Sequence, residues 1–188
     1  MTFTDCSIPG AYHVEIDPFE DERGLFARAW CRDEFAAHGL TASFVQANLA
    51  QSRRAGTLRG LHYQVAPHAE AKLVRCVRGA VYDVIVDLRP DSPAYRQWHA
   101  ERLTAERRNA LYAPPGCAHG YQTLVDDTEL FYLVSAAYAP DAERGLRYDD
   151  PGLAIDWPLD VTVVSDKDQS WPELSSARRD EEMPSAAQ

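Results

Sequence analysis

Turn-forming residues divide this chain into short segments, and this constrains the fold more than any other feature. Twelve Pro and ten Gly are spread over 188 residues, and the apolar segments between them are short. The β-branched residues 80–89 end at Pro90, whereas a helix is predicted only over residues 33–38, before Gly39. Many short strands with Gly and Pro turns predict an all-β, antiparallel sandwich or barrel, best a jelly roll, with few helices.

The composition is that of an ordinary globular protein, with 45% apolar and 26% charged residues. We expect one domain over residues 1–174 and a loose polar tail over residues 175–188. The formal charge of −10 argues against bulk neutralisation of nucleic-acid phosphates. The sequence contains no run of about 18 apolar residues, so no membrane span is predicted. No secretory signal is visible. The widely spaced Cys6, Cys31, Cys76 and Cys117 are typical of reduced cytoplasmic thiols, not of a disulfide framework or a zinc site.

Several polar residues are candidates for a binding site. In the strand predicted over residues 44–52, Gln46 and Asn48 share one face, which is either a solvated outer face or the wall of a barrel. Arg59 and His62 flank Gly60, and Lys72 opens the next apolar strand, over residues 73–78. Clustered cations in an acidic protein can bind a phosphate or an enolate oxygen.

Later candidates are weaker when taken singly. His119 lies in the turn at residues 114–120, and residues 165–168 are a charged turn that faces solvent by default. Tyr132 and Tyr138 are six residues apart in a strand predicted over residues 130–138, so they are expected on the same strand face. Two tyrosines on one face are more often packing residues than catalytic ones.

In combination and in this order, these motifs resemble the family of dTDP-4-dehydrorhamnose 3,5-epimerases. The resemblance extends over residues 8–174 and includes RGLF at 23–26, FVQAN at 44–48, GTLRGLHYQ at 56–64, AKLVR at 71–75 and PGCAHGY at 115–121. It implies a cupin-type jelly roll, a homodimer, and neither a metal nor a nicotinamide cofactor. The implied substrate is a nucleoside-diphosphate 4-keto-6-deoxyhexose, with thymidine as the expected nucleoside, in deoxysugar biosynthesis.

The resemblance also implies a role for each matching residue. The C4 ketone of such a sugar acidifies the hydrogens at C3 and C5, so a base can form an enolate. His62 matches the base, Asp168 the carboxylate that orients it and favours its charged form, Lys72 the stabiliser of the enolate oxygen, and Tyr132 the proton donor. The remaining matches are substrate contacts, of which Tyr138 and Phe26 stack on the thymine and the others are Arg23, Gln46, Asn48, Arg59, His119, Glu143 and Lys167.

Two positions depart from the family pattern. Arg28 stands where a carboxylate is usual, and Tyr121 stands where Phe is common. The reversed charge at Arg28 puts one substrate contact in doubt. Some relatives invert only C3 or only C5 with the same His and Tyr, so the motifs define the chemistry better than the product.

Three alternative functions fit the motifs less well than the epimerase interpretation. A metal-dependent cupin would use His62, His68, Glu70 and His119, but no His-x-His motif is present and His68 follows Pro67. A nucleotide-sugar binding protein without catalysis would not need all four catalytic matches. A ketoisomerase on a similar scaffold finds no support in LRGLHYQ.

Overall fold

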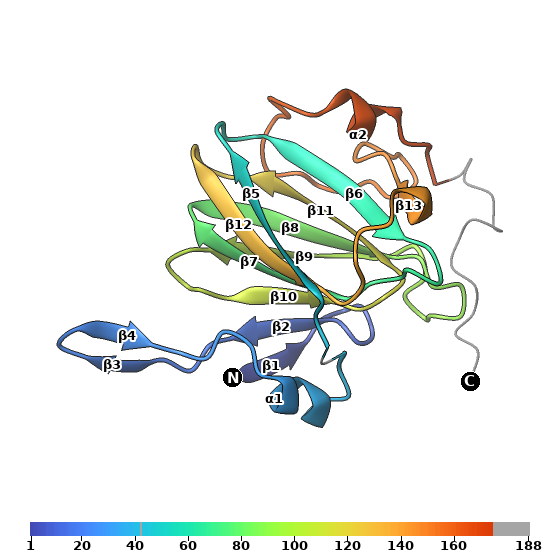
Figure 1. Cartoon of the computed structure of the whole chain (residues 1–188). Coiled ribbons are helices and arrows are strands. Elements are labelled where there is room, and N and C mark those ends of the chain that lie inside the picture. Colours follow the sequence, from blue (N-terminus) through green and yellow to red (C-terminus); the bar gives the residue numbers. More distant parts are fainter. Residues whose placement is uncertain (42, 175–188) are drawn as a thin grey trace.

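Two β-sheets face each other and enclose the main core of the chain (Figure 1). In the computed structural model, which describes residues 1–41 and 43–174, one sheet has six strands in the order β1–β2–β10–β7–β12–β5 and the other has five in the order β13–β6–β11–β8–β9. The named strands all pair antiparallel. The first sheet comprises β1 (Thr2–Asp5), β2 (Tyr12–Glu15), β5 (Gln46–Ser52), β7 (Lys72–Arg78), β10 (Ala110–Ala113) and β12 (Thr128–Val134). The second comprises β6 (Leu58–Gln64), β8 (Ala80–Asp87), β9 (Trp98–Thr104), β11 (Cys117–Thr123) and β13 (Glu143–Gly145).

The helical segments of the described chain are short, so the predicted all-β jelly roll with few helices is confirmed. The helix predicted over residues 33–38 is α1 (Arg32–Ala37). The charged turn at residues 165–168 instead begins α2 (Asp166–Ser170), and a 3-10 turn, η1, covers Pro140–Ala142. The tail predicted over residues 175–188 lies outside the described residues.

The strand predicted over residues 130–138 is wrong in its second half. β12 ends at Val134, and Tyr138 lies in the connection to η1. The physical cause is a side chain, because Gln64 donates to the Ala137 carbonyl oxygen at 3.3 Å and accepts from the Ala139 N–H at 2.6 Å. These bonds hold the connection away from the strand direction, so strand alternation does not relate Tyr138 to Tyr132.

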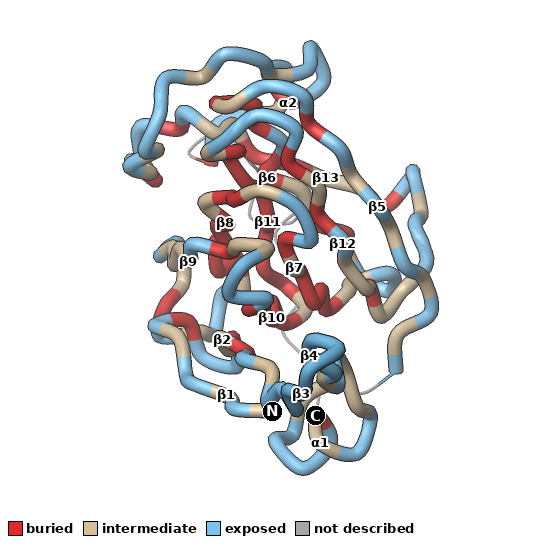
Figure 2. The backbone as a smooth tube through the Cα atoms, turned by 90° about the vertical axis from the view of Figure 1, so that its left-hand side faces the viewer, coloured by how far each residue is buried: buried red, intermediate tan, exposed pale blue. Residues whose placement is uncertain are grey.

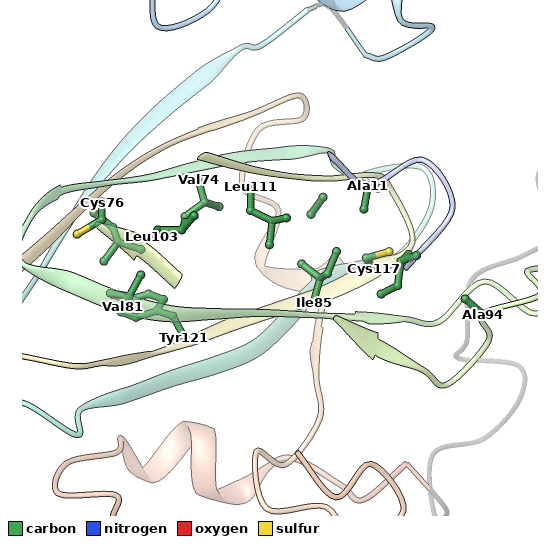
Figure 3. Close-up of a cluster of buried hydrophobic side chains, with 13 residues drawn as sticks. Ala11, Val74, Cys76, Val81, Ile85, Ala94, Leu103, Leu111, Cys117 and Tyr121 are labelled. Atoms are coloured by element: carbon green, nitrogen blue, oxygen red, sulfur yellow. The ribbon is translucent and has the colours of Figure 1, made fainter. Parts of the chain in front are cut away.

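The main core lies between the two sheets. Figure 3 shows Val74 and Leu111 of the six-stranded sheet facing Val81 and Ile85 of β8. The alternate residues of β8, Val84 and Val86, point to the other side and belong to a second buried cluster. Strand β8 is therefore buried on both faces, which explains why its residues are almost continuously buried, Asp83 and Asp87 included.

The second cluster forms because the C-terminal segment covers the outer face of the five-stranded sheet (Figure 1). Leu146, Leu153 and Leu174 of this segment pack with Leu61 of β6 and Val84 of β8. The covering segment includes α2, whose residues approach β6. Apolar packing of this segment on the sheet thus helps to fix the position of α2.

The remaining elements extend from the six-stranded sheet. α1 packs Phe35 against Phe3 and Tyr112, with ring centroids 5.1 and 5.9 Å apart. The hairpin of β3 (Phe19–Asp21) and β4 (Gly24–Phe26) projects from the body and is exposed along its length (Figures 1 and 2). No helix among the described residues is both long and apolar enough to cross a membrane.

Candidate active site

A cavity of about 450 Å³ opens beside β6, β11 and β12 and is closed on one side by the segment that leads into α2. A smaller pocket of about 270 Å³ adjoins it and shares the side chains of His62, Lys72 and Tyr132. Most of the predicted site residues line one of the two pockets, namely Arg59, His62, Lys72, His119, Tyr132, Lys167 and Asp168 in the larger and Gln46, Asn48, Tyr138 and Glu143 in the smaller.

His62 and Asp168 form a hydrogen-bonded pair at the junction of these pockets. The Nε2 atom of His62 is 2.7 Å from Oδ1 of Asp168, and the two side chains are 31% and 5% exposed. Burial alone would raise the pKa of Asp168, but the hydrogen bond and charge of His62, with the N–H of Gly60, outweigh it and hold that pKa below its ordinary value. Asp168 is therefore a carboxylate that orients an accessible imidazole.

The position of Asp168 follows from local helix chemistry. Ser165 caps α2, and its Oγ accepts from the Asp168 N–H at 3.1 Å. The second oxygen of Asp168 accepts from the Gly60 N–H at 3.2 Å. The carboxylate is thus fixed both to its own helix and to the backbone of β6.

Two glycines bring β6 and β11 unusually close beside the site. A Cβ on Gly60 would lie 2.5 Å from the Cα of Gly120, and one on Gly120 would lie 2.7 Å from the Arg59 carbonyl oxygen. Gly60 also has a φ of 123°, which a residue with a side chain rarely adopts. Next to this contact His62 and His119 are register partners, so one backbone feature places both imidazoles.

His119 forms a second pair, with Asp83 of β8. Its Nε2 atom is 2.8 Å from Asp83 Oδ1, and the two side chains are 10% and 0% exposed. Among the described residues, Oδ2 of Asp83 has no hydrogen-bond partner. The imidazole of His119 consequently lines the inner part of the cavity and not its opening.

Lys72 is held in place by two neighbours, one of which is itself supported by a third residue. Its Nζ donates to the His62 carbonyl oxygen at 3.0 Å and is 3.1 Å from Oε1 of Glu70. The other oxygen of Glu70 accepts from Gln64 at 2.6 Å. A largely buried ammonium group therefore faces the pockets next to His62, with its charge balanced by Glu70.

Tyr132 faces the cavity from the opposite sheet. Burial, followed by the charge of Glu70, raises the pKa of its hydroxyl above the ordinary value, while Arg59 acts in the other direction. The hydroxyl is therefore protonated at neutral pH. A base on β6 and a phenol on β12 are the elements needed to remove a proton on one face of a carbon and return one on the other.

The smaller pocket is bordered by a network of polar side chains. Gln46 donates to Asn48 at 2.8 Å and accepts from the Tyr138 N–H at 3.2 Å. Glu143 accepts from the Tyr138 hydroxyl at 2.7 Å and from Lys167 at 2.6 Å. Burial favours a raised pKa for Glu143, but these two hydrogen bonds outweigh it and lower that pKa. Of the two alternatives for the shared face of Gln46 and Asn48, a solvated outer face or the wall of a barrel, the structure favours the wall, because both residues line this pocket.

Arg23 and Phe26 are not brought to either pocket of their own chain. Both lie on the β3–β4 hairpin, where Arg23 pairs with Asp21 and Phe26 is 79% exposed. Figures 1 and 2 place this hairpin on the side of the molecule away from β6 and α2. At Arg28, a position that departs from the family pattern, the guanidinium pairs with Glu34 of α1.

Sequence reasoning did not identify Asp83, Gln64 or Ser165 as site residues, and it considered Glu70 only as a metal ligand. Gln64 belongs to the LRGLHYQ motif, which offered a signal, but the pairing of Asp83 with His119 spans 36 residues and had none. Among the described residues, His62, His68, Glu70 and His119 do not form a group with clustered ligand atoms, whereas Cys6, His99 and Glu101 do. The ligand set of a metal cupin is therefore not assembled.

Comparison with known proteins gives consistent matches over nearly the whole chain. The family model for dTDP-4-dehydrorhamnose 3,5-epimerase matches residues 5–176. The enzyme of that name from Sinorhizobium fredii is 42% identical over 175 residues, covering 93% of this chain and 90% of the relative. A dTDP-4-dehydrorhamnose 3-epimerase from Streptomyces niveus is 41% identical over 95% of this chain and 86% of its own. The crystal structure of a Legionella pneumophila epimerase in complex with dTDP-4-keto-L-rhamnose superimposes with a TM-score of 0.92 at 34% identity, covering 99% of both chains.

Proposed function

This chain belongs to the dTDP-4-dehydrorhamnose 3,5-epimerase family, and from that membership we propose how its cavity inverts a sugar carbon. It is an isomerase of deoxysugar biosynthesis that acts at C3, C5 or both of a dTDP-linked 4-keto-6-deoxyhexose. The single observation that carries the proposal is that His62 of β6 and Tyr132 of β12 line the same cavity from opposite sheets.

In the first step His62 removes the acidic proton next to the C4 ketone. The neutral imidazole accepts the proton, the C–H electron pair enters the enolate, and the charge on the ketone oxygen becomes negative. Asp168, 2.7 Å from Nε2, stabilises the positive charge that develops on the ring. The partial exposure of His62 leaves room for the substrate carbon beside it.

Lys72 is the group that stabilises the enolate oxygen. Its ammonium is fixed by the His62 carbonyl oxygen and by Glu70, so little reorganisation is needed when charge develops. Glu70 keeps the ammonium from being an unpaired buried charge before the substrate arrives. We therefore assign Glu70 a positioning role through Lys72.

In the second step Tyr132 returns a proton to the opposite face of the enolate carbon. Its raised pKa keeps the proton on the hydroxyl until the enolate forms. The resulting phenolate lies in a cavity bordered by Arg59 and Lys72, which favour the anion. Inversion then follows from the placement of acid and base on different sheets.

The other predicted contacts hold the nucleotide sugar. Arg59, His119 and Lys167 supply cationic or donor groups in the larger cavity, which suit a diphosphate and sugar hydroxyls. Gln46, Asn48, Tyr138 and Glu143 surround the smaller pocket. Tyr138 is exposed and free to stack on a base, and the dTDP-linked ligand of the Legionella relative supports thymine as that base.

A second copy of the chain would explain the positions of Arg23 and Phe26. The exposed hairpin that bears them contributes to neither the larger nor the smaller pocket, and the hollow that Arg23 and Phe26 do line is formed by hairpin residues alone. The outer face of the six-stranded sheet is also apolar and uncovered, since Leu49 of β5 and its cross-strand partner Phe131 of β12 are both exposed. We propose a homodimer in which each hairpin completes the partner's site. We also propose that the enzyme works in the cytoplasm, without nucleic-acid or membrane partners.

Mixed dimers test the shared site. A chain with Arg23→Ala and Phe26→Ala and a chain with His62→Asn are each expected to be inactive alone. When the two are mixed after partial unfolding and refolding, one site of each mixed dimer is intact and activity returns. Sedimentation that shows a monomer, or mixtures that stay inactive although mixed dimers form, would contradict the proposal.

Proton NMR in D₂O with dTDP-4-keto-6-deoxyglucose tests the function itself. Deuterium is expected at C3, at C5 or at both, which also settles the regiochemistry that the motifs leave open. His62→Asn serves as the matched control, since it changes the base and leaves the other cavity walls in place. A wild-type protein that binds the substrate but exchanges neither proton would refute the epimerase mechanism.

A further inference from the structure

Three potential metal ligands gather where the edges of the two sheets meet, in a place that contributes to neither pocket. Cys6 follows β1, and His99 and Glu101 lie two residues apart on β9, so that their side chains share one strand face. The thiol, one imidazole nitrogen and one carboxylate oxygen lie within 4.8 Å of one another. Residues almost a hundred positions apart therefore present sulfur, nitrogen and oxygen donors to one point.

Neighbouring side chains orient these three groups. Ser7 Oγ is 3.0 Å from Nδ1 of His99, which directs the other nitrogen, Nε2, toward Glu101 at 3.3 Å. A ligating histidine in a metal site is usually oriented in this way through its second nitrogen. Ser7 is adjacent to Cys6 in the chain, so one short segment supplies both a ligand and the support for another.

The second oxygen of Glu101 is supported by His13 of β2. Nδ1 of His13 is 3.4 Å from Oε2 of Glu101, and this nitrogen is buried with no hydrogen-bond partner among the described residues. On its other side, His13 Nε2 is 3.3 Å from Glu15, which in turn pairs with Arg107 at 3.1 Å. The cluster thus has a polar outer layer, and the unsatisfied nitrogen in that layer is the one on the Glu101 side of His13.

We propose that Cys6, His99 and Glu101 bind one Zn²⁺ ion, with water in the fourth position and His13 as support for Glu101. The donor set suits zinc, which accepts sulfur, nitrogen and oxygen ligands in a tetrahedral arrangement, whereas Ca²⁺ and Mg²⁺ require oxygen ligands. Binding converts the Cys6 thiol to a thiolate and releases its proton to solvent. The three ligands are half-buried, which leaves an entry path for the ion.

The ion would join the two sheets at their edges. Cys6 connects to the six-stranded sheet through β1, and His99 and Glu101 belong to the edge strand of the five-stranded sheet. A ligand that binds only the folded state stabilises it, so zinc is expected to raise the midpoint of thermal unfolding. The epimerisation site does not include these residues, so activity should be the same with and without the ion.

Cobalt provides the sharpest probe, because it replaces zinc and absorbs strongly when a thiolate is bound to it. Full-length protein freed of metal with a chelator is expected to bind one Co²⁺ per chain, with an intense near-ultraviolet sulfur-to-cobalt band that added Zn²⁺ abolishes. Cys6→Ser is expected to lose the band while epimerase activity is retained. Ser7→Ala, which removes only the support for His99, is expected to weaken the affinity about 10–100-fold.

Matched controls identify the site. Cys31→Ser alters another partly exposed cysteine and is expected to keep the band, and His62→Asn keeps it if the ion is not in the catalytic cavity. His99→Asn is a second ligand variant in case Cys6→Ser does not fold. A wild-type protein without the band, a band that survives in Cys6→Ser, or one that disappears in Cys31→Ser would overturn the proposal.

Discussion

The two histidine–aspartate pairs of the cavity have almost the same geometry and quite different surroundings. In each, Nε2 of the imidazole is hydrogen-bonded to Oδ1 of an aspartate, at 2.7 Å for His62 with Asp168 and 2.8 Å for His119 with Asp83. The first imidazole is partly accessible and its aspartate comes from a helix in the covering segment. The second pair is buried, and both its members belong to adjacent strands of one sheet.

In the proposed mechanism, access and support, rather than the pair itself, distinguish the base from a binding residue. Asp168 is fixed through both oxygens and through its own N–H, whereas Asp83 has one oxygen without a partner among the described residues. A fully supported carboxylate can orient an imidazole through the change of charge that accompanies proton transfer. We therefore expect substitutions in the two pairs to affect different kinetic quantities.

The largest effect is expected for His62→Asn. Because a base contributes about 10²–10⁴-fold and here begins the reaction, solvent exchange at C3 and C5 should fall by about 10⁴-fold or more. Binding of dTDP, measured by calorimetry, should stay close to normal. Exchange near the wild-type rate would reverse the assignment of the two pairs, and His119 would then be the first candidate for the base.

The next largest effect is expected for the aspartates, whose substitution should change different kinetic constants in the two pairs. Asp168→Asn retains the size of the side chain but removes the charge that balances the protonated imidazole, so kcat should fall by about 10²-fold or more. Asp83→Asn is the matched control and is expected to change KM more than kcat. Equal losses of kcat in the two variants would show that both pairs take part in the chemical step.

Tyr132→Phe tests whether the hydroxyl on the opposite sheet from the two histidine–aspartate pairs returns the proton. Without the hydroxyl, His62 can still take a proton and give it back on the same face, so deuterium exchange continues while net inversion falls by about 10²-fold. Exchange and inversion are measured on the same sample in D₂O. If both persist at wild-type rates, Tyr132 has no part in the mechanism, and if both disappear, it is needed for enolate formation.

His119→Asn is expected to have a smaller effect, on binding. Loss of a hydrogen bond to a charged substrate group costs about 1.5–3 kcal/mol, which corresponds to a rise in KM of about 10–100-fold. Steady-state kinetics with saturating substrate should show kcat within a few-fold of wild type. A loss confined to kcat would instead place His119 in the transition state.

The smallest effect concerns acid stability. The pKa of Asp168 is lower in the folded chain than the ordinary value of about 3.9, so its charged form stabilises the fold above that pH. This contribution is lost as the pH falls through the lowered pKa. Urea unfolding between neutral pH and pH 3 should therefore show a smaller decrease in unfolding free energy for Asp168→Asn than for wild type. An equal decrease in unfolding free energy for the two proteins would contradict this contribution.

Sequence patterns predicted those parts of the site that depend on neighbours along one strand. The alternation of β5 places Gln46 and Asn48 on one strand face, because strand periodicity is a local property, but it does not decide whether that face is solvated or lines a pocket. The same reasoning failed for Tyr138, because a distant side chain, Gln64, turns the chain after β12. His62 and Lys72 were singled out by composition and spacing, but their roles came from the family resemblance.

Pairings between distant segments could not be derived from the sequence. His62 and Asp168 are 106 residues apart, and only the resemblance joined them. Asp83 is one of several polar residues in the β-branched segment 80–89, and nothing local indicates that His119 faces it. Phe26 matched a family contact, yet no sequence pattern shows that its hairpin projects away from the cavity of its own chain.

The close approach of Gly60 and Gly120 has a consequence for how such an enzyme can diversify. No other amino acid fits at either glycine without displacing backbone atoms. Substitutions at these two positions therefore cannot shift the two imidazoles in small steps. Small apolar walls such as Ala50 and Val163 border the same cavity without that restriction. Directed evolution toward other sugars should therefore yield active variants from libraries at these walls, while libraries at the two glycines should consist mainly of inactive clones.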